Sequence, residues 1–297
     1  MNLGEHGFIP LAPAKLEEED RWILSRLSRV ARRAGKELRA YNPSAAIGAA
    51  REFFWSELCD WYLEIIKPRL KDEAAAPMAR SVLALALDET LRLFHPFVPF
   101  ITEVLWNRLN AQCPARGLAE SLPASPLLIT ARWPEPVPEW EDEVLESKFA
   151  LAQDVVRGIR EVRALQSIPP GRKLGALVKA GGRAADVLAC MRTLIIHMGK
   201  LESLYVAPDM KRPATAASQV VGDIEIYLTG VIDPEKERER LESRRKKLLD
   251  DIGKAEARLG NEGFVRRAPA DVVEKEKQKL KDLTTQIESI DVHLKAL

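Results

Sequence analysis

Residues 233–297 carry a heptad pattern, which constrains the fold of this chain more than any other feature of its sequence. Apolar residues recur there mostly three or four positions apart, in two runs. The first run is Leu241, Leu248, Ile252, Ala255 and Leu259, and the second is Leu280, Leu283, Ile287, Ile290, Leu294 and Leu297. Gly260 and Gly263 end the first helix, and Pro269 with Asp271 begins the second. The sequence therefore predicts an antiparallel coiled-coil hairpin with arms of roughly 40 Å.

A dense aromatic cluster marks a second helical region, from Pro43 to Leu70, in a chain that is only 6% aromatic. At about 100° per residue this segment presents two adjacent apolar stripes and one polar side. The stripes are Ile47, Ala50, Phe54, Leu58, Trp61 and Ile65, and Trp55, Cys59, Tyr62 and Ile66; the polar side is Glu52, Ser56, Asp60, Glu64 and Lys67. A buried face this wide needs more than one partner helix.

Neighbouring segments supply those partners. Asp20 is the expected N-cap of a helix whose apolar stripe runs from Ile23 to Leu38, and further helices are expected over residues 78–94 and 99–109. Residues 20–110 are therefore predicted to form an α-helical bundle. A Pro-rich covering loop follows to residue 143, with a short extended piece at 127–130, and residues 1–19 form a lead-in segment.

The middle of the chain changes its pattern. A helix is expected over residues 143–165, then strands over 173–179, 201–206, 219–221 and 224–228, with a helix over 184–197. The predicted fold class is mainly α: a helical bundle, a small α+β unit and a coiled-coil hairpin. The predicted domains are residues 1–19, 20–143, 144–232 and 233–297.

Composition limits the chemistry that we expect. The net charge is only +1. The three cysteines, Cys59, Cys113 and Cys190, are scattered along the chain, and this pattern favours a reducing compartment and no disulfides. No membrane-spanning run, signal peptide, metal-binding cluster or Gly-rich phosphate loop is present, so we expect a cytoplasmic, monomeric protein without membrane contact, metal or catalytic residues. Glu57, Asp60 and Glu64 suit a polar helix face, paired with Lys67 and with Arg residues of the first helix, better than a catalytic carboxylate pair.

Basic residues are concentrated beside the aromatic helix. Residues 21–71 hold eleven Lys or Arg against five Asp or Glu, and a one-sided surplus favours a polyanion, although a merely solvated face remains the alternative. Phe53 lies on the polar side and either packs under another helix or is exposed to stack on an unpaired base. The candidate residues are Arg26, Arg29, Arg33, Lys36, Phe53 and Lys67.

Several runs resemble known proteins. DRWILSRL, FFWSELCDWYLEIIKPRL and LRLFHPFVPFITEVLW resemble the anticodon-binding helical domain of class I aminoacyl-tRNA synthetases. GVIDPEKERERLESRRKKL and LGNEGFVRRAPADVVEKEKQKL resemble the C-terminal coiled-coil arm of bacterial valyl-tRNA synthetases, most specifically at NEGFVRRAP. The family's HIGH-like and KMSKS-like motifs are absent, so the resemblance is to the C-terminal part of these enzymes, without the catalytic and editing domains.

The resemblance implies a function and partners. The bundle would bind the anticodon end of tRNA(Val), and the arm would bind the tRNA elbow through its clustered charges, Arg244, Arg245, Lys246, Lys247, Arg266 and Arg267. ATP and Mg would belong to the missing catalytic portion of the synthetase, a further expected partner, and this chain alone would be inactive and hold no cofactor. The alternative is a protein-interaction module without tRNA binding, whose association would depend far less on salt.

Overall fold

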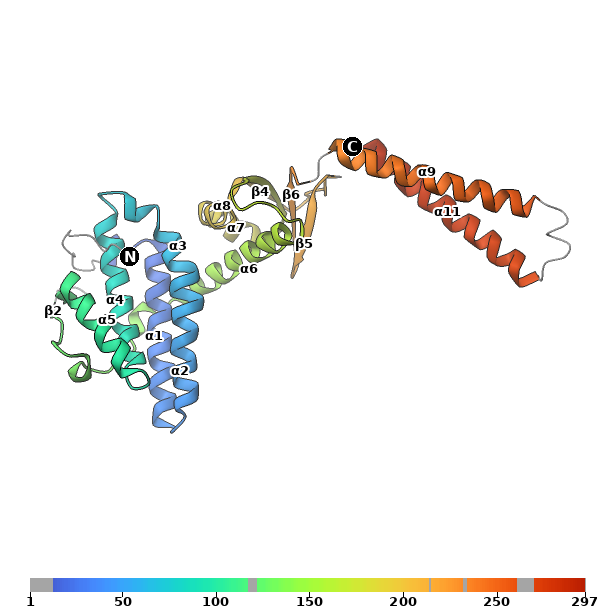
Figure 1. The fold of residues 1–297 in the computed structure, drawn as a ribbon. Coiled ribbons are helices and arrows are strands. Elements are labelled where there is room, and N and C mark those ends of the chain that lie inside the picture. Colours follow the sequence, from blue (N-terminus) through green and yellow to red (C-terminus); the bar gives the residue numbers. More distant parts are fainter. Residues whose placement is uncertain (1–12, 117–121, 214, 232–233, 261–269, 297) are drawn as a thin grey trace. The chain divides into compact units, whose positions relative to one another are not determined.

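The computed structural model describes residues 13–116, 122–213, 215–231, 234–260 and 270–296 (Figure 1). The chain forms two compact units that divide between Gln153 and Asp154. The predicted fold class is confirmed: the chain is mainly α, with a helical bundle and a small unit that contains a sheet. Within the described ranges, no helix is both long and apolar enough to cross a membrane.

The first unit is a bundle of antiparallel helices (Figure 1). Its elements are α1 (Glu18–Arg39), α2 (Pro43–Glu52), η2 (Phe53–Tyr62), α3 (Leu63–Ile66), α4 (Ala76–Phe94) and α5 (Pro99–Gln112), with 3-10 turns at Pro13–Lys15 and Arg69–Lys71. Pro43 and Pro99 stand at the first turns of α2 and α5, where a missing N–H costs nothing. Ala79, Ala84 and Ala86 are buried on α4, and such small side chains let neighbouring helices approach closely.

Asp20 has a different position from the one predicted. The N-cap of α1 is Glu17, and Asp20 is the third helical residue, whose carboxylate accepts from the Glu17 N–H at 3.2 Å in a capping box. The same buried carboxylate accepts from the Tyr62 hydroxyl at 2.7 Å and from the Arg69 guanidinium at 2.8 Å. Burial, helped by Asp20, raises the pKa of Tyr62 well above its ordinary value. This network ties the start of α1 to the end of the aromatic helix.

The aromatic helix is continuous from residue 43 to residue 66, but its middle, η2, is a π-helix. A π-helix bonds each N–H to the carbonyl five residues earlier, as Leu63 does to Leu58. Successive residues of one buried seam along this helix are accordingly four positions apart, except for Phe53 and Leu58, which are five positions apart. This seam is Ala49, Phe53, Leu58, Tyr62 and Ile66. The prediction of a uniform 100° rotation was therefore wrong across this segment.

A loop with little regular structure covers α4 and α5. Its described parts include paired two-residue strands, β1 (Ala115–Arg116) and β2 (Leu122–Pro123), and 3-10 turns at Leu128–Thr130 and Pro138–Trp140. The extended piece predicted at residues 127–130 is thus mostly a 3-10 turn. The indole of Trp106 donates to the Ser125 carbonyl at 2.8 Å and lies between two guanidiniums, those of Arg92 and Arg116, at 5.5 and 4.6 Å. These contacts hold the loop on the bundle.

The second unit contains a four-stranded sheet of order β4-β3-β6-β5. Besides the C-terminal hairpin, this unit contains the second half of α6 (Glu143–Leu165), β3 (Leu174–Lys179), α7 (Gly182–Cys190), α8 (Arg192–Gly199), β4 (Leu201–Ala207), β5 (Ala217–Val221) and β6 (Ile224–Thr229). β3 is parallel to β4, whereas β6 is antiparallel to both of its neighbours. A Cβ on Gly158 of α6 would lie 2.9 Å from both Ile226 and Val221, so glycine permits the close approach of this helix to the sheet. The helix predicted over 184–197 is two helices, divided at Met191.

The C-terminal hairpin consists of α9 (Pro234–Leu259) and α11 (Ala270–Ala296), which run antiparallel (Figure 1). Leu241, Leu248, Leu283 and Ile290 form its buried core, and Ile252, Ile287 and Leu294 pack against them half-buried. The heptad positions therefore meet along the predicted seam. Leu297, the last residue of the second apolar run, lies outside the described residues.

Candidate tRNA-binding surface

Arg26, the first residue of the predicted basic stripe, is held by two carboxylates within the bundle. Its guanidinium donates to Glu57 at 2.8 and 2.7 Å and to Glu146 at 2.9 Å. The hydrogen bond with Glu57 raises the pKa of Arg26 above its ordinary value, against the opposing effect of burial. Because both carboxylate side chains are about 15% exposed or less, a phosphate would have to displace well-shielded, charge-assisted partners to reach this residue.

Arg29 is paired in the same way. It donates to Glu146 at 2.7 Å and to Glu143 at 3.0 Å, and the hydrogen bond to Glu143 leads the causes that raise its pKa. Glu146 also accepts from Ser25, so three donors of α1 converge on one carboxylate of α6. About one helical turn further along α1, Arg32 donates to Glu141 at 2.6 Å.

These pairs correct the charge argument that the sequence supported. The surplus over residues 21–71 omitted Glu141, Glu143 and Glu146, which the fold brings against α1 from more than 100 positions along the chain. Stacking of Trp22 on Phe149, with centroids 4.9 Å apart and ring planes at 7°, holds the start of α6 there. The stripe is therefore partly a structural ion-pair network.

Arg33 and Lys36 form the accessible part of the stripe. The Arg33 side chain is 60% exposed, and among the described residues it pairs only with Glu52, at a long 3.6 Å. Lys36 is exposed, and its ammonium group makes no hydrogen bond or ion pair with any residue that the structure describes. These two cations can meet a phosphate without disrupting the bundle.

The observed burial of Phe53 and Trp55 is the reverse of the burial predicted from the sequence. Phe53 is 2% exposed, so the expectation that it is exposed and stacks on a base was wrong, and the alternative of packing under another helix was right. Trp55, predicted to be buried, is 58% exposed. The cause is the five-residue step of η2, which turns Phe53 inward. The five-residue spacing of Phe53 and Leu58 is the signal in the sequence that the α-helical interpretation missed.

Lys67 does not join this site. It is exposed and paired with Glu64 at 2.5 Å, and it lies two residues before Arg69, which bonds to Asp20 at the start of α1. Asp20 and Lys36 are sixteen residues apart on one helix, or about 24 Å at 1.5 Å per residue. The predicted pairing with basic residues is confirmed for Glu57, by Arg26, and for Glu64, by Lys67, whereas Asp60 forms no ion pair with a residue that the structure describes.

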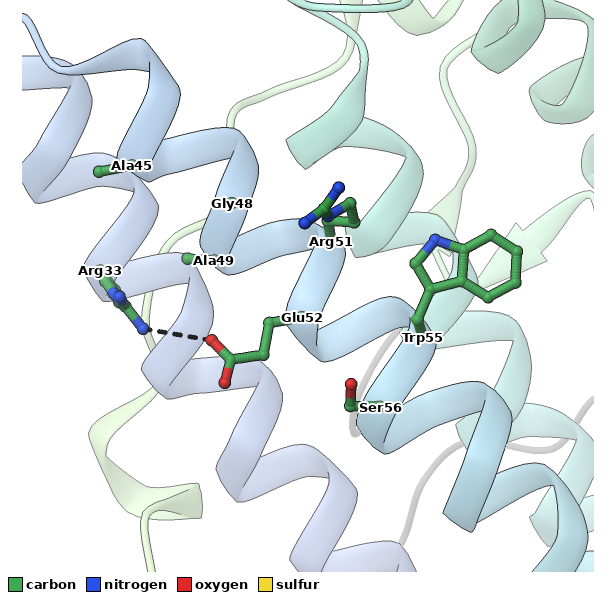
Figure 2. A pocket seen from close by; sticks show the side chains of 8 residues that line it. All are labelled: Arg33, Ala45, Gly48, Ala49, Arg51, Glu52, Trp55 and Ser56. Carbon is green, nitrogen blue, oxygen red and sulfur yellow. Dashed lines mark ion pairs between the residues drawn. The ribbon is translucent and has the colours of Figure 1, made fainter.

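A groove of about 560 Å³ lies between α1 and the helix formed by α2 and η2 (Figure 2). Its floor is made of small residues, Ala45, Gly48 and Ala49, and its rim carries Arg33, Arg51, Glu52 and Trp55. In Figure 2, Arg33 and Glu52 face each other across the groove, whereas Arg51 and Trp55 extend from one side of the helix. A cavity of this size and lining can admit a planar ligand.

The basic block on α9 is mostly accessible. Arg245 pairs across the hairpin with Asp291 at 2.6 Å, and this hydrogen bond raises its pKa. Arg244, Lys246 and Lys247 are exposed, with no ion pair to a described residue. Arg266 and Arg267, the other predicted residues of the arm, lie outside the described residues. Three cations on one stretch of α9 are thus available to a polyanion.

Comparison with known proteins identifies these regions. Residues 20–178 match the family model for the anticodon-binding domain of tRNA ligase. The chain belongs to this tRNA ligase family. Residues 233–297 match a second family model, the valyl tRNA synthetase tRNA binding arm. The anticodon-binding match covers the bundle from Asp20 onward, including the groove, and the arm match covers the hairpin of α9 and α11.

Individual members of this tRNA ligase family are similar in sequence to nearly the whole length of the chain. Valine–tRNA ligases from Rhodopirellula baltica, Geobacter sulfurreducens and Thermotoga maritima are 36%, 38% and 37% identical over 98%, 96% and 98% of the chain. The chain spans only 28%, 32% and 32% of their respective lengths. The predicted resemblance to the tRNA-binding part of valyl-tRNA synthetases is confirmed.

Proposed function

We propose that this chain is the tRNA-binding part of a valine–tRNA ligase and that its partner is tRNA(Val). The observation that carries the proposal is the presence of both matched regions, the anticodon-binding domain and the tRNA binding arm, in the same chain. In this proposal residues 20–143 bind the anticodon arm, residues 233–297 bind the tRNA elbow, and residues 144–232 link them. The protein acts as a monomer in the cytoplasm, where its tRNA partner is used.

The accessible cations suit this role. Arg33 and Lys36 on the bundle, and Arg244, Lys246 and Lys247 on the arm, offer two separate positive clusters to a phosphate backbone. Phosphate contacts supply much of the affinity of proteins for nucleic acid and make it fall steeply with salt. The small net charge of +1 does not conflict with this, because local clusters and not the total determine the contacts.

The chemistry of valylation lies outside these residues in our proposal. We assign the joining of valine to tRNA with ATP and Mg to a catalytic portion outside the residues of this chain, which spans only 28% and 32% of the length of two valine–tRNA ligases. We therefore expect the purified chain to give no valine-dependent exchange of pyrophosphate into ATP. Exchange by this chain alone would overturn that part of the proposal.

A titration at two salt concentrations tests the binding proposal. The full chain is titrated with a tRNA(Val) transcript and with an unrelated tRNA, each at low and at near-physiological ionic strength. We expect tighter binding of tRNA(Val), and a log–log salt slope of roughly −0.7 to −0.9 per phosphate contact. Absence of binding, or affinity that does not change with salt, would favour a protein-interaction module instead.

A further inference from the structure

Trp55 is a large apolar side chain in an unusual setting. Trp55 is 58% exposed, and its ring packs edge-on against Phe54 with centroids 5.0 Å apart and planes at 72°. Phe54 in turn packs edge-on against Phe94 of α4 at 5.8 Å. A large aromatic ring that is supported from within the bundle and open to solvent is a preformed stacking surface.

The surroundings of Trp55 select a ligand of a particular kind. Arg51, one helical turn away, is exposed, and its guanidinium makes no hydrogen bond or ion pair with any described residue. Arg33 stands across the groove, and its pairing with Glu52 at 3.6 Å reduces the repulsion of Glu52 on an anion. At Gly48 a Cβ would meet nothing within 4 Å, so the floor is open.

From this arrangement we infer that the groove between α1 and α2 binds one unstacked nucleobase of the anticodon loop, with the base on Trp55 and its neighbouring phosphate on Arg51 (Figure 2). This inference rests on the proposed tRNA binding and assigns the base contact to a residue other than Phe53. Proteins recognise single-stranded RNA by stacking its bases on aromatic side chains and by neutralising its phosphates with basic ones. The groove supplies both contacts one helical turn apart.

The test uses the full chain and an RNA hairpin with the sequence of the tRNA(Val) anticodon arm, carrying 2-aminopurine at one loop position at a time. Stacking on an aromatic ring quenches 2-aminopurine. We expect the fluorescence to be quenched at one loop position. Trp55→Ala should remove that quenching and weaken the affinity roughly 5- to 150-fold, whereas Trp55→Phe should keep the quenching. Tyr205→Ala is the matched control, because Tyr205 is 57% exposed on β4, and it should change neither quantity.

A second variant tests the phosphate contact without risk to the fold. Arg51→Gln removes an exposed charge that has no partner among the described residues, and it should reduce the log–log salt slope by about 0.7 while the quenching remains. Unchanged affinity and quenching in Trp55→Ala would overturn the inference and leave the proposed function standing. Equal losses in Trp55→Phe and Trp55→Ala would also overturn it, because stacking would not then be the contact. Failure of the parent chain to bind tRNA at all would overturn both.

Discussion

Arg26 and Arg33 lie seven positions apart on α1, and their surroundings differ: Arg26 is held by two shielded carboxylates, whereas Arg33 is mostly exposed. Arg26→Met keeps the aliphatic stem but removes three hydrogen bonds, leaving Glu57 and part of Glu146 without their cation. Hydrogen bonds to charged groups contribute about 1.5–3 kcal/mol, and exposed ion pairs contribute about 0.2–1 kcal/mol. Since the Arg26 side chain is 35% exposed and its carboxylates 15% and 13%, we expect Arg26→Met to lower the free energy of unfolding by about 2 kcal/mol.

Arg33→Met is the matched control. The Arg33 side chain is 60% exposed, and its long ion pair is with Glu52, whose side chain is 65% exposed. Arg33→Met should therefore lower the free energy of unfolding by less than about 0.5 kcal/mol. Urea unfolding followed by tryptophan fluorescence measures both changes, and Trp22 and Trp61 report on the core of the bundle. A double-mutant cycle of Arg26→Met with Glu57→Gln isolates the pair itself.

Binding should reverse the order of the two variants. Arg33→Met should weaken tRNA binding and reduce the magnitude of the salt slope by about 0.7–0.9, whereas Arg26→Met should leave the slope unchanged wherever the protein remains folded. The reasoning is refuted if Arg26→Met unfolds no more readily than the parent. It is equally refuted if Arg26→Met, and not Arg33→Met, changes the salt slope.

Three further predictions concern other parts of the chain. In the hairpin, Ile290→Ala should cost about 2–5 kcal/mol and Ile287→Ala clearly less, since Ile290 is buried and Ile287 half-buried; thermal unfolding with equal losses would contradict this. A shortened chain that ends at residue 233 should keep the circular dichroism and melting of the first unit but bind tRNA less well, and equal affinity would make the hairpin a structural element. Burial raises the pKa of Glu89 to about 7 from an ordinary 4.5, so the stability that protonated Glu89 contributes is present below about pH 4.5 and is lost as the pH rises through 7. Glu89→Gln should therefore raise the free energy of unfolding by about 2–3 kcal/mol at pH 8 and leave it unchanged near pH 4, whereas the control Glu73→Gln, at an exposed position, should show no such pH dependence.

Local patterns in the sequence predicted most of the fold. The bounds of α6, β3 and β4 agree with prediction within one or two residues, because apolar periodicity and flanking Pro and Gly act over short distances. The seam of α9 and α11 was predictable for the same reason, since one loop joins the two helices and a heptad repeat defines the contact.

The candidate site was harder to predict, because its properties depend on distant partners and on a change in helix type. Nothing near Arg26 in the sequence shows that Glu146, 120 positions away, will neutralise it. Likewise, a uniform helical rotation places Phe53 outside and Trp55 inside, the reverse of their observed exposures of 2% and 58%. The composition of the aromatic cluster indicated that an aromatic side chain could be exposed, but the geometry of η2 determines that this side chain is Trp55.

The π-helical segment also bears on how this helix tolerates insertions and deletions. Between Phe53 and Leu58 the chain contains one residue more than an α-helix needs to keep those two positions on the same face. Deleting one residue there would restore a four-residue step and leave the buried seam in register, whereas a deletion between Ala46 and Ala50 would rotate the preceding turn by about 100° away from the core. A chain that lacks one residue between Trp55 and Leu58 would therefore keep the same bundle, and Trp55, about 200° round the helix from the buried Phe53, would still point outward.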